Sequence, residues 1–422
     1  MRSSWQFVFW GILALTLAGC GGSSNLTSPP PTNSSPQTIT MTFTESAPTA
    51  AAVQMGTGAF TPVAVQNKQI SFTLPGGISK YAFAFVCPTL SFGSPQFNTT
   101  SEVVLEATAQ DGTSISTPNC SSGVATGNLS GTADASLIAG TSQVRVVGSL
   151  GAATTAVSGT PFNVNLPTGI NDVAVVALDV SGNVLAVRII HSQAVPGTLN
   201  GGSPVILNSN DTTTLQTVTE NNAPAGLTPF SFVEYFTANG TPIVLQSSTN
   251  LQYPAIPAAS VQAGDFYLFN PEASNAPTNS SVISVFQSST TAGPLTVTMP
   301  QPWSSTSPLP GAFPTFSFNY SGFSGQPTIV DEIELDWLAN STNGTDLSVK
   351  ATASFQNGAN TITVPDLTAL PGFLPSATSG TTVQWLAAIS GGSELPLSIL
   401  IGGFSPNTSY SQVESKGTYT AP

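Results

Sequence analysis

Charged residues are scarce in this chain of 422 residues. Only 6% are Asp, Glu, Lys or Arg, against about 25% in an average soluble protein. The lone histidine, His191, excludes a histidine-rich metal site, and no Gly-x-Ser-x-Gly elbow accompanies it for Ser-His-Asp catalysis. We therefore expect His191 to be a strand-end surface residue. The chain has seven Lys and Arg residues and 20 Asp and Glu residues, and the basic residues form no run. This composition argues against nucleic-acid binding.

Long hydrophobic runs are also missing: no apolar segment reaches the ~18 residues of a membrane-spanning helix. The first apolar run, residues 7–18, follows Arg2 and leads into Leu17-Ala18-Gly19-Cys20. A positive start, a short apolar core and small residues before a cleavage point are typical of a secretory signal. Residues 1–20 resemble bacterial lipoprotein signals, in which the cysteine is diacylated and becomes the mature N-terminus. The resemblance implies a signal peptide at residues 1–19 and lipidation at Cys20.

The same resemblance implies where the protein resides. Acyl chains on Cys20 would tether an otherwise soluble body to a membrane, since each buried CH₂ contributes about 0.8 kcal/mol. Gly21 stands where an Asp would retain enteric lipoproteins at the inner membrane, so the family rule favours the outer membrane of a bacterial envelope. Residues 20–37 are rich in Ser, Pro and Gly, which predicts a disordered linker.

Cysteine is rare, and with Cys20 lipidated only Cys87 and Cys120 remain. An exported protein resides in an oxidising compartment, where such a pair forms disulfides. We predict a Cys87–Cys120 bridge. Two cysteines and one distant histidine do not make a zinc site, and no cofactor is predicted.

What the chain does contain is the pattern of β-strands. Apolar residues alternate with Thr, Ser or Asn in many short segments, and Gly-containing turn pairs such as Asn239-Gly240 separate them. Gly 38 and Pro 34 supply further turns. No segment sustains a helical period. The sequence therefore predicts an all-β fold.

An internal repeat subdivides this β-rich chain. The segment from Ile70, ISFTLPGGISKYAFAFVC, matches that from Phe162, FNVNLPTGINDVAVVALD, with weaker copies from Tyr253 and Ile362. A spacing of roughly 100 residues suits immunoglobulin-like β-sandwiches. We predict tandem sandwich domains at residues 38–130, 131–205, 206–299 and 300–422. The run VAVVAL should form a central strand buried on both faces.

The densest acidic cluster is VDEIELDWL, with Asp331, Glu332, Glu334 and Asp336. Glu332, Glu334 and Asp336 share one strand face, and Ile333, Leu335 and Trp337 the other. The pattern favours a solvated strand face, with a cation site and a hydrolase acid–base pair as alternatives.

Three tryptophans follow the signal: Trp303, Trp337 and Trp385. Trp337 and Trp385 are in phase with apolar neighbours and are expected in the core. Trp303 lies among Pro and Ser, so we expect it to be exposed and, with Tyr320 and Phe323, to form a candidate sugar-binding platform.

The favoured function is a non-catalytic, lipid-anchored envelope protein that acts as an interaction or structural module. Its partners would be the membrane and a protein or polysaccharide. A carbohydrate-binding lipoprotein and a hydrolase are the alternatives. Tandem domains after a linker would place residues 300–422 farthest from the membrane.

Overall fold

The computed structural model describes residues 35–422 except 45, 88–89, 93–96, 118–119, 121–124, 150, 156, 158, 276–280, 304–307, 310, 324–325, 327, 340–342 and 394–405. β-Strands dominate these residues, as predicted, and the single α-helix among them is one turn long. None of the helices in this part of the chain has the length and apolar character needed to cross a membrane.

The strands group into four successive regions, which we number 1 to 4. Region 1 (residues 37–120) contains β1 (Gln37–Phe43), β2 (Ala50–Met55), β3 (Thr61–Pro62), β4 (Gln69–Leu74), β5 (Lys80–Val86), β6 (Leu90–Phe92), β7 (Phe97–Thr108) and β8 (Ser114–Thr117). Region 2 (residues 126–213) contains β9 (Thr126–Asp134), β10 (Gln143–Gly148), β11 (Gly151–Thr155), β12 (Thr160–Pro167), β13 (Gly169–Leu178), β14 (Val184–Val195), β15 (Gly197–Thr198) and β16 (Val205–Ile206). The 3-10 helices η1 (Leu199–Gly202) and η2 (Ser209–Asp211) complete it.

The remaining elements belong to the second half of the chain. Region 3 (residues 214–299) contains β17 (Thr214–Asn221), β18 (Thr228–Phe236), β19 (Pro242–Ser248), β20 (Gln252–Ala255), η3 (Ala258–Ser260), β21 (Phe266–Ser274), β22 (Ser281–Ser289) and β23 (Leu295–Thr298). Region 4 (residues 300–422) contains β24 (Thr315–Ser317), β25 (Thr328–Leu338), β26 (Asn343–Thr352), α1 (Ala353–Gln356), β27 (Thr361–Thr363), β28 (Thr382–Gly392) and β29 (Ser409–Thr420).

The strand connectivity repeats from region to region. In regions 1, 2 and 3 the first strand pairs antiparallel with the fourth strand, giving the pairs β1–β4, β9–β12 and β17–β20. On its other side the first strand pairs parallel with the end of the region: β8 in region 1, β15 and β16 in region 2, and β23 in region 3. The second layer has the orders β3-β2-β5-β7, β11-β10-β13-β14 and β19-β18-β21-β22. Region 4 repeats the scheme with β24-β27 and β26-β25-β28-β29. All four sequence repeats therefore fall on equivalent strands, the weak copies from Tyr253 and Ile362 included.

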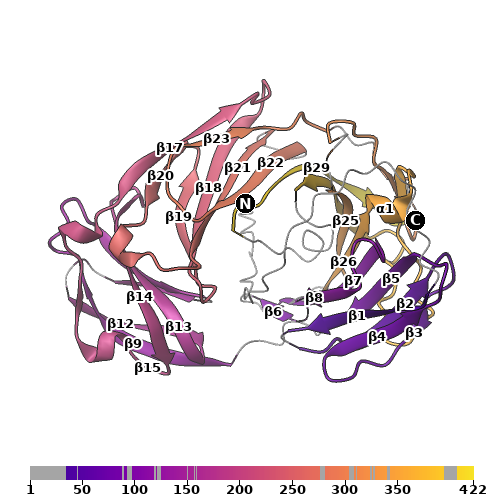
Figure 1. Cartoon of the computed structure of the whole chain (residues 1–422), viewed down its shortest axis with the longest axis horizontal. Helices are drawn as coiled ribbons and strands as arrows, with labels where there is room; N and C mark the ends of the chain where they lie inside the picture. Colours follow the sequence, from indigo (N-terminus) through magenta and orange to yellow (C-terminus); the bar gives the residue numbers. More distant parts are fainter. Residues whose placement is uncertain are drawn as a thin grey trace.

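One sheet runs through three of the four regions. Thirteen strands form it, with β29 pairing with both β22 and β28, and β26 pairing parallel with β7. Figure 1 shows the result: region 4 lies between region 1 and region 3, and the regions follow one another around an arc. The expectation that residues 300–422 lie at the far end of a row is wrong, because β26 and β7 are neighbours in one ladder.

The shared sheet also explains where the cores lie. One cluster inside region 1 contains Ile39, Phe83 and Leu105, and a second inside region 2 contains Val146 and Val164. The largest cluster takes side chains from all four regions. β13 contributes to two of these clusters, since Val175 faces the region 2 core and Val176 the common one. The predicted burial of VAVVAL on both faces is confirmed.

Two domain boundaries shift with respect to the expected ones. Residue 130 lies inside β9, which pairs along its whole length with β12. Residue 205 begins β16, which pairs with β9, and Arg188 of β14 reaches Asp211 at 2.6 Å. Region 2 thus extends to about residue 213, because the segment after residue 205 satisfies hydrogen bonds of the region 2 sheets.

Candidate functional site

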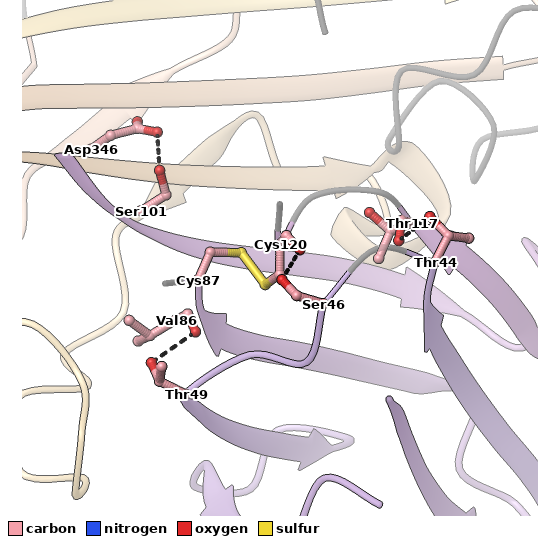
Figure 2. The surroundings of a disulfide bond; sticks show 9 residues. All are labelled: Thr44, Ser46, Thr49, Val86, Cys87, Ser101, Thr117, Cys120 and Asp346. Carbon is pink, nitrogen blue, oxygen red and sulfur yellow. Dashed lines mark hydrogen bonds between the residues drawn. A yellow bond between two sulfur atoms is a disulfide. The ribbon is translucent and has the colours of Figure 1, made fainter. Parts of the chain in front are cut away.

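The predicted disulfide is present. Cys87 follows β5 and Cys120 follows β8, and the two sulfur atoms are bonded in the buried core of region 1 (Figure 2). The Ser46 hydroxyl donates to the Cys120 carbonyl beside the bridge, and the Thr49 hydroxyl donates to Val86 O at 3.1 Å. The bridge therefore ties the end of one layer to the end of the other. Cys20, the predicted lipidation site, lies outside the described residues.

The predicted aromatic platform is not formed. Trp303 is only 4% exposed and stacks on Phe318 at a centroid distance of 5.6 Å, so it belongs to the common core. Phe323 is equally buried and packs edge-on against the half-buried Tyr320. The expectation of an exposed Trp303 is wrong, because its ring packs against Phe318 in the common core. Trp337 and Trp385 are buried, as predicted.

The acidic segment forms most of β25, and its alternation places the side chains as predicted. Ile333, Leu335 and Trp337 enter the common core. Glu332, Glu334 and Asp336 are half-buried on the other face. That face is not simply solvated, because neighbouring strands place further polar groups on it.

β26 supplies the partners of these carboxyl groups. The antiparallel register sets Glu332 opposite Lys350, Glu334 opposite Ser348 and Asp336 opposite Asp346. Lys350 Nζ lies 2.7 Å from Glu332 Oε1, and β7 adds Ser101, whose hydroxyl donates to Asp346 Oδ2 at 3.0 Å. We call Glu332, Glu334, Asp336, Asp346 and Lys350 the inner carboxylate cluster.

The cluster holds more acids than it can neutralise. Burial raises the pKa of Asp336 to about 7, with a further contribution from the Asp346 charge. Burial likewise raises the pKa of Glu334 well above its usual range, reinforced by Glu332. Burial disfavours the charge of Lys350, but Glu332 and Glu334 outweigh that effect and raise the pKa of the ammonium group. At neutral pH we expect one ion pair surrounded by carboxyl groups that retain protons.

The same face of the sheet continues toward region 3. On β29, Lys416 Nζ lies 2.7 Å from Glu414 Oε2. On β21, burial and the Glu414 charge raise the pKa of Glu272 to about 7. Burial does the same for Glu234 on β18. In Figure 1 the sheet β17, β20 and β23 lies on the outer side of β18, β21 and β22, so this polar face is turned to the inside of the arc.

Asp331 does not belong with the other three acids of its segment. Its side chain lies on the opposite face, where it accepts a hydrogen bond from Gln356 Nε2 of α1 at 2.8 Å. Burial raises its pKa to about 7. Within the described residues no group of three or more His, Cys, Asp or Glu side chains has a geometry that could hold a metal ion. The alternative of a cation site formed by Asp331, Glu332, Glu334 and Asp336 is therefore wrong: Asp331 lies on the opposite face, and Glu332 is paired with Lys350.

Sequence reasoning missed Asp346, Ser348 and Lys350. The signal was present, because Asp-Leu-Ser-Val-Lys at 346–350 alternates polar and apolar residues and follows β25 as the return strand of a hairpin. Ser101 gave no such signal, since its strand comes from 245 residues earlier in the chain.

His191 is not a strand-end surface residue. It lies inside β14 with its side chain 16% exposed, and its Nδ1 lies 3.2 Å from Oδ2 of the buried Asp172. Its Nε2 lies 3.2 Å from the backbone oxygen of Ser260 in η3. The Ser260 hydroxyl instead accepts from the Ile189 N–H, so the three residues resemble a Ser-His-Asp triad in composition but not in connectivity.

Asp172 is the centre of this contact between regions 2 and 3. It accepts from the Ser192 N–H at 2.9 Å and from Asn239 Nδ2 at 3.0 Å, and its carbonyl accepts from the Thr241 hydroxyl. Burial opposes the charge of Asp172, but the bonds from Ser192, Asn239 and His191 outweigh it and lower the pKa. The network holds two regions together by side chains.

Comparison with known proteins adds no family or named relative. No family model matches the chain, and no curated protein is significantly similar to it.

Proposed function

We propose that this protein is a non-catalytic lipoprotein of the bacterial cell envelope that serves as a rigid structural and interaction module. The observation that carries the proposal is the N-terminal signal, in which Leu17-Ala18-Gly19-Cys20 follows one positive charge and a short apolar run. Cys20 would carry the lipid, and Gly21 favours the outer membrane as its location.

We further propose that each region is an immunoglobulin-like β-sandwich. The second layer has the strand order third-second-fifth-sixth in regions 2, 3 and 4, and region 1 has the same order once the three-residue strand β6 is set aside. This order is compatible with the C′-C-F-G sheet of immunoglobulin variable domains. The first layer pairs its first strand with the fourth in every region, as strands B and E pair in the same scheme.

The shared sheet supports a rigid role. Two-sheet domains joined only by linkers reorient freely, whereas region 4 is held to regions 1 and 3 by continuous backbone ladders. A body of this kind keeps any binding surface at a constant position relative to the membrane anchor.

The environments of the reactive residues support a role without catalysis. The polar atoms of His191 and Asp172 bind each other, Ser192 and Ser260 at the contact between regions 2 and 3. Glu332 is paired with Lys350. Within the described residues these groups stabilise the fold.

The anchor is tested by metabolic labelling with an alkyne fatty acid in a bacterial host. The wild-type chain should be labelled and should sediment with membranes, because a thioether-linked lipid forms on Cys20. Cys20→Ala should lose the label and appear in the soluble fraction. The matched control Ser23→Ala, three residues farther along the linker, should keep both properties. A labelled Cys20→Ala variant, or an unlabelled wild type, would refute the anchor.

The interaction role is tested by chemical crosslinking in intact cells. We expect the anchored chain to be joined to a defined envelope component and the released Cys20→Ala chain to lose that contact. The non-catalytic role is tested separately: an activity found with wild type and abolished in both Glu332→Gln and Glu334→Gln would overturn it.

A further inference from the structure

A groove lies where β19, the edge strand of the thirteen-stranded sheet, meets the face of β10 and β13 in region 2. On the side of region 2 it is lined by Arg145 and Val147 of β10 and by Val176 and Leu178 of β13; region 3 contributes Pro242 and Val244 of β19. Its cavity volume is about 220 Å³, and the groove is partly open to solvent. This volume is below the roughly 300–1,000 Å³ of drug-sized sites, so the groove suits a small, narrow ligand. Apart from Arg145, the named lining residues are apolar.

Arg145 is unusual among the cations of this protein. Arg188 binds Asp211, Lys350 binds Glu332 and Lys416 binds Glu414. Lys80 lies over the ring of Phe355, and Lys68 also has an interaction. Among the residues that the structure describes, Arg145 is the one cation for which no hydrogen bond, ion pair or ring contact is found. Its side chain is exposed in a chain of net charge −13.

We propose that this groove binds the free fatty acid class of ligand: one carboxylate held by Arg145 and an unbranched acyl chain lying along Val147, Val176, Leu178 and Val244. The planar guanidinium presents two parallel N–H donors, which match the two oxygens of a carboxylate. The apolar walls from β13 and β19 would remove the acyl chain from water.

The charge of the groove determines which head group of an amphiphile fits it best. One unpaired Arg145 neutralises one negative charge, and no other cation is among the groove residues. A phosphate carries up to two charges, and the acidic body of the protein would repel the second. A fatty alcohol or a fatty amine would leave Arg145 without a partner. The monocarboxylate is therefore the best match.

The proposal is tested by calorimetric titration of the whole mature chain, Cys20–Pro422, with Cys20→Ala so that no acyl group of its own competes. Octanoate, decanoate and dodecanoate are used below their micelle concentrations, with decanol and decylamine as probes that share the apolar body. We expect one carboxylate per chain. Affinity should rise about fourfold for each added methylene that stays in the groove. Decanol and decylamine should bind at least tenfold more weakly than decanoate.

Three variants separate the groove from non-specific attraction. Arg145→Gln should weaken decanoate binding about tenfold or more and leave decanol unchanged. Ala152→Trp, at an exposed groove position, should block all the probes. Lys68→Gln, which removes a cation elsewhere, should bind decanoate like the parent chain.

Any of three results would overturn the proposal: equal binding of decanoate and decanol, equal binding by Arg145→Gln and the parent chain, or no binding of any carboxylate. If a peptide with an apolar C-terminal end binds through Arg145 and decanoate does not, the groove belongs to a peptide partner and the fatty acid proposal fails. Circular dichroism of each variant verifies that the fold is retained.

Discussion

Regions 2 and 4 join their neighbours in different ways. Region 4 enters the thirteen-stranded sheet, with β26 paired along Asn343–Ala351 to β7 and β29 paired to β22. In the described part of the chain, no strand of region 2 enters that sheet. Region 2 contacts region 3 through Asp172, His191 and the apolar face of β13.

The difference matters because the two joints depend on different physical terms. The backbone hydrogen bonds of a ladder contain no titratable group, so pH acts on region 4 only through the side chains that its strands carry. The side-chain joint needs an ionised Asp172, whose pKa is lowered. The acids on the sheet of region 4 are shifted in the opposite direction: burial raises the pKa of Asp336 and Glu334, so the folded state favours their protonated forms. Acid should therefore weaken the joint of region 2, and base should weaken region 4.

The largest effect is expected from deleting Ser409–Pro422, which removes β29. Both β22 and β28 lose a partner strand, and Val413 leaves the common core. We expect regions 3 and 4 to lose cooperative folding, while region 2, with both layers of its own, keeps protected amides. Hydrogen exchange resolved by peptide measures this directly. Equal protection of β28 in the deletion variant and the full chain would show that the ladder does not couple the regions.

The next effect should come from the disulfide. Replacing Cys87 and Cys120 together by Ala opens a loop of 33 residues, for which loop entropy predicts a loss of about 3–4 kcal/mol. Because β7 of region 1 pairs with β26 of region 4, the loss of protection should extend to β26 and spare β10. Chemical denaturation gives the size of the effect, and hydrogen exchange gives its spread. If β10 loses as much protection from hydrogen exchange as β26, the two joints do not differ in how they couple neighbouring regions.

Asp172→Ala should cost about 2–3 kcal/mol at neutral pH, because the Ser192 N–H, Asn239 and His191 lose a buried acceptor. The lowered pKa means that the stabilisation is present above about pH 4 and is lost as the pH falls through the folded-state value. The difference between wild type and variant, measured by urea unfolding, should therefore shrink at pH 3. A constant difference at both pH values would contradict the assigned role of the charge.

The sequence predicted local features better than distant ones. The alternation in β25 and the double-sided burial of β13 were readable because each depends on a strand's own period of two. The repeat located equivalent strands in all four regions because each copy contains the alternation of its own strands. The disulfide was readable because only two cysteines remained after Cys20.

The partners across the sheet were not readable. Nothing in the residues around Ser101 indicates that β7 lies beside β26, since strand pairing between distant segments leaves no local pattern. Trp303 was misplaced because its Pro- and Ser-rich neighbours are typical of a linker, whereas the Trp303 side chain belongs to the common core. His191 was misplaced because its partners, Asp172 and Ser260, come from two different regions.

The smallest and sharpest test compares two Asp→Asn variants with opposite expected pH dependence. Burial raises the pKa of Asp336 to about 7, so its contribution to stability is fully present below about pH 4 and is lost as the pH rises through about 7. Asp336→Asn cannot ionise. It should match wild type at pH 4 and exceed it at pH 8, by about 1–2 kcal/mol after allowing for the half-exposed side chain.

Asp172→Asn should behave in the reverse sense, with its greatest loss at pH 8 and its smallest at pH 3, because the folded state prefers the Asp172 anion. Urea unfolding of both variants and wild type across this pH range measures the two slopes in one experiment. Slopes of the same sign would mean that both acids respond to the net charge of the whole molecule. Only local burial and local hydrogen bonds give the two acids opposite preferences for the charged form.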